Sequence, residues 1–393
     1  MRAIAIISSF FFVCTACGKS DNSNNTPVLS SLLVGNITQV RNSNEPTIFH
    51  FVIDINPVNA KDISVNYTTK DGTAVSGKDY TAVSGTLTIP AKQFTGFIDV
   101  IVTADSLRQD DQIFTLELSS PVNAKLPASK ATGTIQNMGT YIPVENTGYT
   151  SALSYTGMTL VWSDEFSSKI LNAANWTYET GGSGWGNNEL EYYTNSQNNT
   201  FLTGGYLIIE ARKETMSTNN YTSARIISKD KKTFTYGRID IRAKLPKGQG
   251  LWPAIWMLGN NISQPGYGWP ACGEIDIMEL LGQNSQNVYG TVHWGISGQG
   301  STHIGGNYTI STGDFSSSFH VFSLQWDTTR LTFLVDDVAY FTANKTDVSG
   351  DYPFDKPFFF IMNVAVGGNW PGSPNSSTSF PQRMIVDYVR VFQ

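Results

Sequence analysis

Alternation of apolar and polar residues, the pattern of half-buried β-strands, recurs along the chain. Near the N-terminus it occupies residues 62–67, 85–89 and 113–118, which are short runs separated by turn-forming residues. Towards the C-terminus it returns in residues 239–245 and 331–335, and no long helical stripe of apolar residues interrupts it. The chain is therefore predicted to be all-β, with a sandwich in its N-terminal part.

The distribution of tryptophan divides the chain into two parts. All nine Trp residues lie between Trp162 and Trp370, whereas the preceding segment is rich in Thr, Val, Ile and Asp. This change of composition predicts a smaller β-sandwich at 28–137 and a larger, Trp-rich domain at 158–393. The stretch between them, 138–157, contains Gly and Pro and is predicted to be a linker.

The first residues have the pattern of an export signal. Arg2 precedes a short apolar run, residues 3–13, which is followed by small residues and Cys17. This resembles a bacterial lipoprotein signal of residues 1–17 that leaves Cys17 lipidated, with a plain secretory signal as the alternative. The apolar run is too short for a lasting membrane span, so only the lipid would hold the protein at a membrane. Residues 18–27 are polar and are predicted to be a flexible tether.

The protein is accordingly expected to be exported and lipid-anchored to the bacterial outer membrane or cell surface, or else secreted. The formal net charge is −6 with only 26 basic residues, which argues against nucleic acid or an anionic polysaccharide as its target. Once the signal is removed, Cys272 is the only thiol of the folded part, so no intramolecular disulfide is expected. Cys272 is predicted to be a buried bystander, with a catalytic thiol as the alternative.

Three carboxylates lie within one apolar run, residues 273–280. Glu274, Asp276 and Glu279 are separated there by Ile and Met side chains. Burying like charges so close together costs free energy and shifts their pKa values. Retaining glycoside hydrolysis needs such an arrangement, with two carboxyl groups about 5–5.5 Å apart, one ionised as nucleophile and one protonated as acid. The alternative is an amphipathic strand with a solvated acidic face.

The spacing of the acids distinguishes a strand from a helix. On a strand Glu274 and Asp276 share one face, whereas strict alternation turns Glu279 to the opposite face. One extra residue, accommodated as a β-bulge, returns Glu279 to the shared face. A helix of period 3.6 would separate Glu274 from the other two acids. The catalytic hypothesis therefore predicts a bulged strand, with the bulge near residues 277–278.

Aromatic and amide residues surround the acids in the sequence. Residues 251–258 alternate as a strand that places Trp252 and Trp256 on one face, where they line either a cleft floor or the core. Two further stretches, residues 184–193 and 361–372, combine Trp, Tyr and Asn with Gly. Aromatic faces stack on sugar rings and amides bind hydroxyl groups, so these segments are consistent with a saccharide cleft.

These motifs together resemble glycoside hydrolase family 16, in its laminarinase-like branch, over residues 158–393. The acids match the signature Glu-x-Asp-x-x-Glu of the members that contain a bulge. One departure is Glu191, which stands where Gln is commoner and is expected to affect a sugar subsite. The other matching blocks, in family order, are residues 185–190, 192–194, 221–226, 236–238, 252–256, 363, 367–372 and 387–391.

The resemblance implies a β-jelly roll with a cleft across its concave face and a retaining endo-β-1,3-glucanase. In that family pattern Glu274 is the nucleophile and Glu279 the general acid/base, while Asp276 lies between them and shares their proton. No cofactor is expected for catalysis, and a monomer is expected. The alternatives are a hydrolase of mixed-linkage β-1,3-1,4-glucan or another neutral polysaccharide, and a non-catalytic glucan-binding protein.

The resemblance also implies two sets of ligand-binding residues. A structural calcium ion away from the cleft would be held by Glu165, the Gly205 carbonyl group and Asp387, although calcium prefers six to eight oxygen ligands. His293 is expected either beside the acid/base or as a structural partner, and Arg225 is either a sugar ligand or a surface residue. The expected substrate contacts are Asn187, Glu189, Arg225, Trp252, Trp256, His293 and Asn363.

The smaller domain resembles the Calx-β domain. The matching residues are 65–74, 77–80 and 114–116, all within the predicted sandwich at 28–137. We expect this module to serve as a spacer or adhesion domain.

Overall fold

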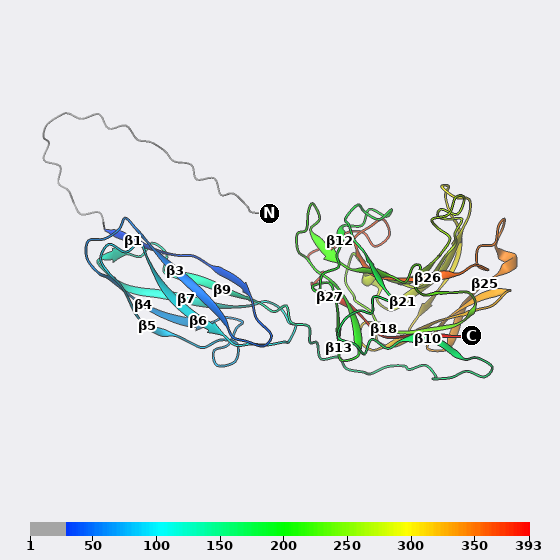
Figure 1. Ribbon diagram of the computed structural model, residues 1–393, viewed down its shortest axis with the longest axis horizontal. Coiled ribbons are helices and arrows are strands. Elements are labelled where there is room, and N and C mark those ends of the chain that lie inside the picture. The colour runs from blue at the N-terminus through cyan, green and yellow to red at the C-terminus, as the bar shows by residue number, and fades with distance from the viewer. Residues whose placement is uncertain (1–28) are drawn as a thin grey trace, which may run out of the picture. The chain divides into compact units, whose positions relative to one another are not determined.

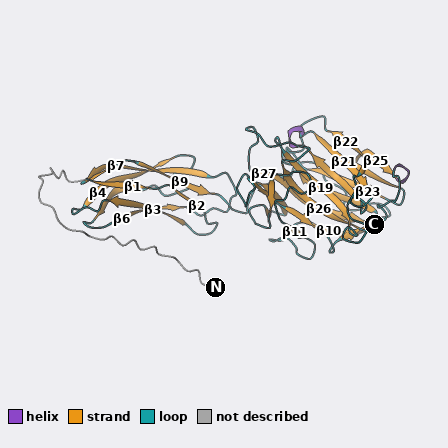
Figure 2. Ribbon diagram, turned by 90° about the horizontal axis from the view of Figure 1, so that it is seen from above, coloured by secondary structure: helices purple, strands orange, loops and turns teal. Residues whose placement is uncertain are grey.

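The computed structural model describes residues 29–393, which divide into two compact units. The signal, the tether and Cys17, predicted at residues 1–27, lie outside the described residues. Strands and loops make up nearly all of both units, which confirms the all-β prediction (Figure 1, Figure 2). Among the described residues no helix has the length and apolar character needed to cross a membrane.

The first unit contains two sheets whose inner faces form one core. Buried aromatic residues from both sheets meet there, with Phe49 and Phe51 of one sheet against Phe114 of the other. The first sheet consists, in spatial order, of β6 (Thr95–Val102), β3 (Thr47–Asn56), β1 (Ser30–Val34) and β8 (Ala124–Lys125). The second sheet consists of β2 (Ile37–Val40), β9 (Lys130–Gln136), β7 (Gln112–Val122), β4 (Ile63–Asp71) and β5 (Ser84–Ile89).

The second unit comprises residues 137–393 with two short segments, 40–45 and 104–110. Its first large sheet, the support sheet, contains β13 (Thr200–Thr203), β14 (Tyr206–Ala211), β27 (Gln382–Phe392), β18 (Gly237–Lys244), β23 (His320–Trp326), β24 (Arg330–Val335) and β25 (Val338–Asn344), with β10 (Leu160–Asp164) also paired to β27. Its second, the cleft sheet, contains β11 (Thr177–Glu179), β16 (Arg225–Ile227), β26 (Phe358–Val366), β19 (Leu251–Gly259), β20 (Glu274–Leu280), β21 (Asn287–Trp294) and β22 (Thr302–Thr309), with β17 (Thr233–Phe234) also paired to β26.

Smaller elements complete the unit: the parallel pair β12 (Glu191–Tyr193) and β15 (Tyr221–Ser223), and the 3-10 turns η1 (Gly282–Asn284) and η2 (Lys345–Asp347). The support and cleft sheets form two layers, seen in Figure 1 from the separate positions of β18 and β26. Strand β26 is buried along its whole length. Successive side chains of β26 point to opposite faces of the sheet. Phe360 and Met362 therefore join the main core, whereas Phe359 and Ile361 pack with Cys272 on the other face.

The segment predicted as a linker, residues 138–157, lies in the second unit and hydrogen-bonds to the support sheet. The hydroxyl groups of Ser151 and Tyr388 are 2.8 Å apart, and the Tyr155 hydroxyl donates to Asp240 Oδ2 at 2.7 Å. These side chains cover part of the outer face of the sheet. The second unit therefore includes polar contacts from residues upstream of 158.

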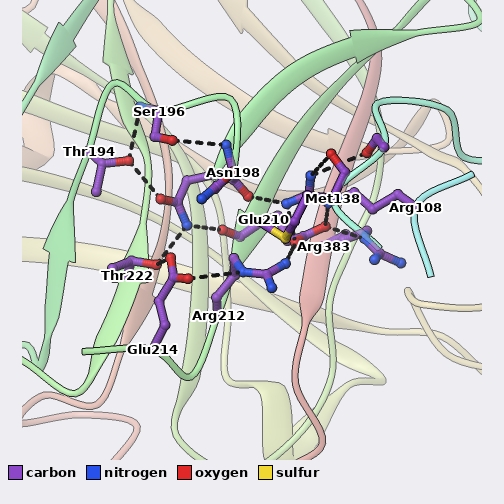
Figure 3. Close-up of polar contacts among 12 residues, drawn as sticks. Arg108, Met138, Thr194, Ser196, Asn198, Glu210, Arg212, Glu214, Thr222 and Arg383 are labelled. Carbon is purple, nitrogen blue, oxygen red and sulfur yellow. Dashed lines mark hydrogen bonds and ion pairs between the residues drawn. The ribbon is translucent and has the colours of Figure 1, made fainter. Parts of the chain in front are cut away.

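A buried ion cluster fastens another upstream residue to the same unit (Figure 3). Arg108 donates to both carboxylate oxygens of Glu210 on β14, each at 2.8 Å, and Arg383 donates to the same carboxylate at 2.7 Å. Arg212 is a third partner of Glu210. Burial alone would raise the pKa of Glu210, but its hydrogen bonds and charge interactions with these arginines hold that pKa below its ordinary value.

Candidate active site

A β-bulge in β20 turns all three acids towards one side of the cleft sheet. Against β19, Ile255 pairs with Met278 but Trp256 pairs with Asp276. Against β21, the pairing also shifts between Asp276 and Glu279. Strand β20 thus has one residue more than its neighbours, which confirms the bulge predicted at 277–278.

A cleft of about 660 Å³ lies over this bulge. Every residue predicted for catalysis or substrate contact lines it: Glu274, Asp276, Glu279, Asn187, Glu189, Arg225, Trp252, Trp256, His293 and Asn363. The structure thus brings together residues from distant parts of the chain. Their assignment to chemical roles remains a prediction that geometry supports.

Glu274, Asp276 and Glu279 form a row of acids, here called the acidic row. Glu279 lies at one end of this row, deep in the cleft. Its Oε1 atom accepts a hydrogen bond from Trp252 Nε1 at 2.9 Å. Burial, followed by the negative charges of Asp276 and Glu274, raises the pKa of Glu279 well above the ordinary value. A raised pKa favours the protonated carboxyl group, which is the state that a general acid requires.

Glu274 lies at the other end of the row. Its Oε2 atom accepts a hydrogen bond from Trp269 Nε1 at 2.8 Å. Burial and then the charge of Asp276 raise its pKa, whereas His293, the Trp269 hydrogen bond and Arg225 act to lower it. Three neighbouring groups thus favour the ionised form of Glu274, which is the form that a nucleophile requires.

Asp276 lies between the two glutamates and is almost completely buried. Its Oδ2 atom is 3.2 Å from His293 Nε2, and the same nitrogen is 3.8 Å from Glu274 Oε1. Burial raises the pKa of Asp276, whereas a hydrogen bond with Glu274 lowers it. His293 thus contacts Asp276 and lies near Glu274, and its positive charge also acts to lower the pKa of Glu279.

A chain of hydrogen bonds supports the cleft beside the acids. Trp256 Nε1 donates to Asn363 Oδ1 at 2.8 Å, and Asn363 Nδ2 donates to the Tyr193 hydroxyl at 3.0 Å. The Tyr193 hydroxyl in turn donates to Glu189 Oε2 at 3.0 Å, and Asn187 Nδ2 reaches Glu189 Oε1 at 3.4 Å. The orientation of Trp256 is therefore linked to that of Glu189 across the cleft wall.

Arg225 is part of the cleft wall. Its guanidinium group lies between two indole rings, 4.8 Å from the ring centroids of both Trp185 and Trp256. Its Nε atom donates to Glu179 Oε2 at 2.6 Å. These contacts hold the positive charge in place at the cleft wall.

Trp185 and Trp370, from the two stretches expected at a saccharide cleft, also line it, and so do Trp269 and His303, which sequence reasoning did not assign to the site. The residues Trp269 and Trp370 are 42% and 41% exposed, although Trp is highly buried on average. Their position in Gly- and Pro-containing loops was the available signal. The sequence alone did not show that the loop containing Trp269 lies beside the acids.

The residues predicted to hold calcium do not fit that ion in this structure. Glu165 receives two hydrogen bonds from Arg390, at 2.9 and 2.8 Å, and Asp387 receives one from Arg242 at 2.6 Å. Gly205 lies in the turn between β13 and β14. A carboxylate already paired with a guanidinium group offers a weak ligand, and calcium needs six to eight oxygens. We therefore derive no role for calcium.

Comparison with known proteins identifies the family. The sequence model described as glycosyl hydrolases family 16 matches residues 188–390, and a second, described as beta-glucan synthesis-associated protein SKN1/KRE6/Sbg1, matches residues 46–274. The chain is 44% identical over 244 residues to a beta-glucanase of Rhodothermus marinus, covering 60% of this chain and 85% of that protein. It is 40% identical over 263 residues to glucan endo-1,3-beta-glucosidase A1 of Niallia circulans, covering 60% of this chain and 38% of that protein.

A solved structure gives the same result for the fold. The catalytic domain of an endo-1,3-beta-glucanase (laminarinase) from Thermotoga petrophila RKU-1 matches 60% of this chain and 98% of its own length, with 47% identity and a TM-score of 0.56. The matching family model covers more than half of the chain and includes the bulged strand with its three acids. The chain therefore belongs to glycosyl hydrolases family 16 and is a glycoside hydrolase.

Proposed function

We propose that the protein is a retaining endo-β-1,3-glucanase that cleaves internal bonds of laminarin-like glucans. The observation that carries the proposal is the bulge in β20, which directs Glu274, Asp276 and Glu279 into one cleft lined by tryptophans. Hydrolysis with retention requires two carboxyl groups on opposite sides of the scissile bond and close enough for one to act as nucleophile. The two ends of the acidic row provide them.

In the first step the Glu274 carboxylate attacks the anomeric carbon and forms an ester bond to the sugar. The bond between that carbon and the glycosidic oxygen breaks at the same time, and Glu279 gives its proton to the departing oxygen. The Trp252 N–H then stabilises the carboxylate left on Glu279.

In the second step Glu279, now ionised, removes a proton from water. The water oxygen attacks the anomeric carbon and the ester bond to Glu274 breaks, which restores both groups to their starting states. Glu274 loses its negative charge when the ester bond forms and regains it when that bond breaks. Its hydrogen bond and charge interaction with Asp276 change accordingly. The reaction needs no cofactor, because all proton transfers stay within these carboxyl groups and water.

The composition of the cleft supports a neutral polysaccharide as the substrate. Five tryptophans line it and offer flat apolar faces to sugar rings: Trp185, Trp252, Trp256, Trp269 and Trp370. The overall charge of −6 disfavours sulfated chains. Two of the similar proteins are named as endo-1,3-beta-glucanases, which supports β-1,3-glucan as the substrate.

The substrate assignment is tested by incubating the mature protein with laminarin, barley mixed-linkage glucan, agarose and cellulose. We expect β-1,3-linked oligosaccharides of mixed size from laminarin and little product from agarose or cellulose. A clear preference for barley glucan would reassign the enzyme to mixed-linkage substrates. Release of glucose alone would contradict internal cleavage.

The mechanism is tested by proton NMR of the first products from laminarin, where retention predicts that the β-anomer is formed before mutarotation. The Glu279→Gln variant should lose turnover by about 10²–10⁴-fold, because general acid catalysis is removed. It should still bind laminarin in affinity electrophoresis. Glu145→Gln, a change at an exposed position, is the control and should behave as the unmodified enzyme.

We also propose that the first unit is a Calx-β-like module, within the predicted boundaries 28–137, that separates the catalytic unit from a lipid anchor on Cys17. Labelling of cells with a radioactive fatty acid should mark the protein, and Cys17→Ala should remove the label and release the protein into the medium. A label that survives this substitution would contradict the anchor. Size-exclusion chromatography with light scattering tests the predicted monomer.

A further inference from the structure

We propose that Glu179 is a positioning residue that keeps the indole of Trp185 in the cleft wall by fixing the guanidinium group of Arg225. Among the described residues, those that line the cleft include Trp185 and Arg225 but not Glu179. The order of the wall follows from the geometry of the second unit alone, whereas its effect on substrate binding rests on the glucanase function proposed above.

Glu179 lies on β11, the edge strand of the cleft sheet. It pairs across the sheet with Arg225 on β16, and Arg225 pairs in turn with Asn363 on β26. Residues directly opposite each other on antiparallel strands have neighbouring side chains on one face of the sheet. Glu179 Oε2 accepts the Arg225 Nε–H at 2.6 Å, and this charge-assisted hydrogen bond sets the direction of the guanidinium plane.

The Arg225 guanidinium group connects two indoles of the cleft wall. Its central carbon lies over the ring of Trp185 and over that of Trp256, 4.8 Å from each ring centroid. The contacts are attractive because a cation faces the negative face of each ring. Trp256 has a second anchor, since it lies on β19 in the middle of the sheet and donates its Nε1–H to Asn363 at 2.8 Å.

Trp185, in contrast, belongs to a glycine-rich loop, residues 181–186. Its φ angle is 46°, in the left-handed region that a bulky side chain disfavours. Such a conformation persists where the surrounding contacts determine it. The Trp185 indole donates to the Gly181 carbonyl group at 3.1 Å and meets the Tyr193 ring at a centroid distance of 5.3 Å. The contact with Arg225 joins the loop to the cleft sheet.

Loss of the Glu179 carboxylate should therefore loosen the wall and leave the reacting groups in place. Without its acceptor the Arg225 side chain can rotate away from Trp185, which would lose its contact with the sheet. Glu274 and Glu279 keep their own indole donors on Trp269 and Trp252. The change should weaken the binding of sugar rings and have little effect on the steps that break bonds.

The first experiment measures amide hydrogen exchange in the peptide that contains residues 181–189, by mass spectrometry and without substrate. In the native chain the N–H groups of Asn187 and Glu189 donate to the Gly184 carbonyl group, at 2.9 and 3.1 Å, and should be protected. In Glu179→Ala this peptide should exchange about tenfold faster, because the loop opens more often. In Glu179→Gln the exchange should stay close to that of the native chain, because the amide oxygen still accepts the Arg225 Nε–H.

Glu117→Ala is the matched control for this measurement. Glu117 pairs with Lys130 in the first unit, and its side chain is 30% exposed, against 33% for that of Glu179. The control should leave the exchange of the 181–189 peptide unchanged. Equal exchange in the native chain and in Glu179→Ala would overturn the proposal.

Arg225→Lys provides a second test that does not depend on the folding of Glu179→Ala. Lysine keeps the positive charge but has no planar guanidinium group to lie over two indoles. This variant should also show fast exchange in the 181–189 peptide. Exchange at the native rate would contradict the role given to the guanidinium group.

The second experiment measures kcat and KM on laminarin. In Glu179→Ala KM should rise by about tenfold while kcat stays within about twofold, because the wall and not the acidic row is disturbed. Glu179→Gln should return KM to within about twofold of the native value. A fall in kcat at unchanged KM, or a Gln variant no better than the Ala variant, would overturn the link to substrate binding. If the native enzyme releases nothing from laminarin, the proposed glucanase function fails, whereas the exchange experiment still decides the role of Glu179.

Discussion

Trp252 donates its indole N–H to Glu279 Oε1 at 2.9 Å, and this hydrogen bond lowers a pKa that burial and nearby charges raise. Trp269 has the same relationship to Glu274, at 2.8 Å. Each end of the acidic row therefore has an indole that favours its ionised form. Substitution of each tryptophan in turn therefore tests the acid limb and the alkaline limb of the pH profile of kcat/KM separately.

Replacement of Trp252 by Phe should move the alkaline limb of kcat/KM to higher pH. The acid must be protonated, and loss of the donor raises the pKa of Glu279 further. The maximal rate should fall by about tenfold, roughly 1.4 kcal/mol, because the carboxylate formed during reaction loses a hydrogen bond. Trp185→Phe is the control: its indole donates to the Gly181 carbonyl group, so that variant should leave both limbs in place.

Replacement of Trp269 by Phe should instead move the acid limb of kcat/KM to higher pH. The nucleophile must be ionised, and removal of the donor raises the pKa of Glu274. Activity below the optimum should therefore fall more than activity above it. An acid limb that shifts to lower pH would contradict the assignment of Glu274 as the nucleophile.

Replacement of Arg108 by Ala should destabilise the catalytic unit by about 1–3 kcal/mol at neutral pH. The buried Glu210 carboxylate would lose two hydrogen bonds but keep Arg212 and Arg383. A lowered folded-state pKa contributes stability that is fully present above the unfolded pKa, so the deficit should shrink as pH falls below about 4.3 towards the folded-state pKa of Glu210.

Chemical denaturation followed by Trp fluorescence measures this difference. Arg330→Ala, which removes an exposed ion pair with Asp327, should change stability by less than about 0.5 kcal/mol. A truncated chain that begins at residue 158 should show at least the loss seen for Arg108→Ala, since it lacks Arg108 and also Ser151 and Tyr155. Equal stability of the full and truncated chains would refute the role of these upstream contacts.

Replacement of Cys272 by Ala should leave activity within about twofold and lower stability by about 1 kcal/mol. The thiol is fully buried, and burial followed by the charge of Glu274 raises its pKa to about 11. Iodoacetamide should therefore modify the unfolded chain but not the native enzyme at neutral pH. Rapid inactivation of the folded enzyme by this reagent would favour the catalytic-thiol alternative.

Local sequence patterns were sufficient to predict the class of fold and to locate the acidic row. Alternation along a strand is a property of neighbouring residues, so runs such as residues 239–245 could be recognised without knowledge of their partners. The same rule made the bulge predictable, because Glu279 faces the cleft only if β20 contains one residue more than alternation allows. The family resemblance then supplied the expected roles.

The contacts that tune the site depended on tertiary structure. Trp269 lies five residues before Glu274, yet only the folding of its loop over the cleft directs the indole to that carboxylate. Arg108 and Glu210 are 102 positions apart, and Glu191 meets Val366 across 175. Such pairs form because sheets and loops from distant segments pack together, and the energy of that packing depends on shape and burial across the unit. The periodicity of the sequence determines which residues share one face of a strand. The assembled fold decides which residues lie opposite that face.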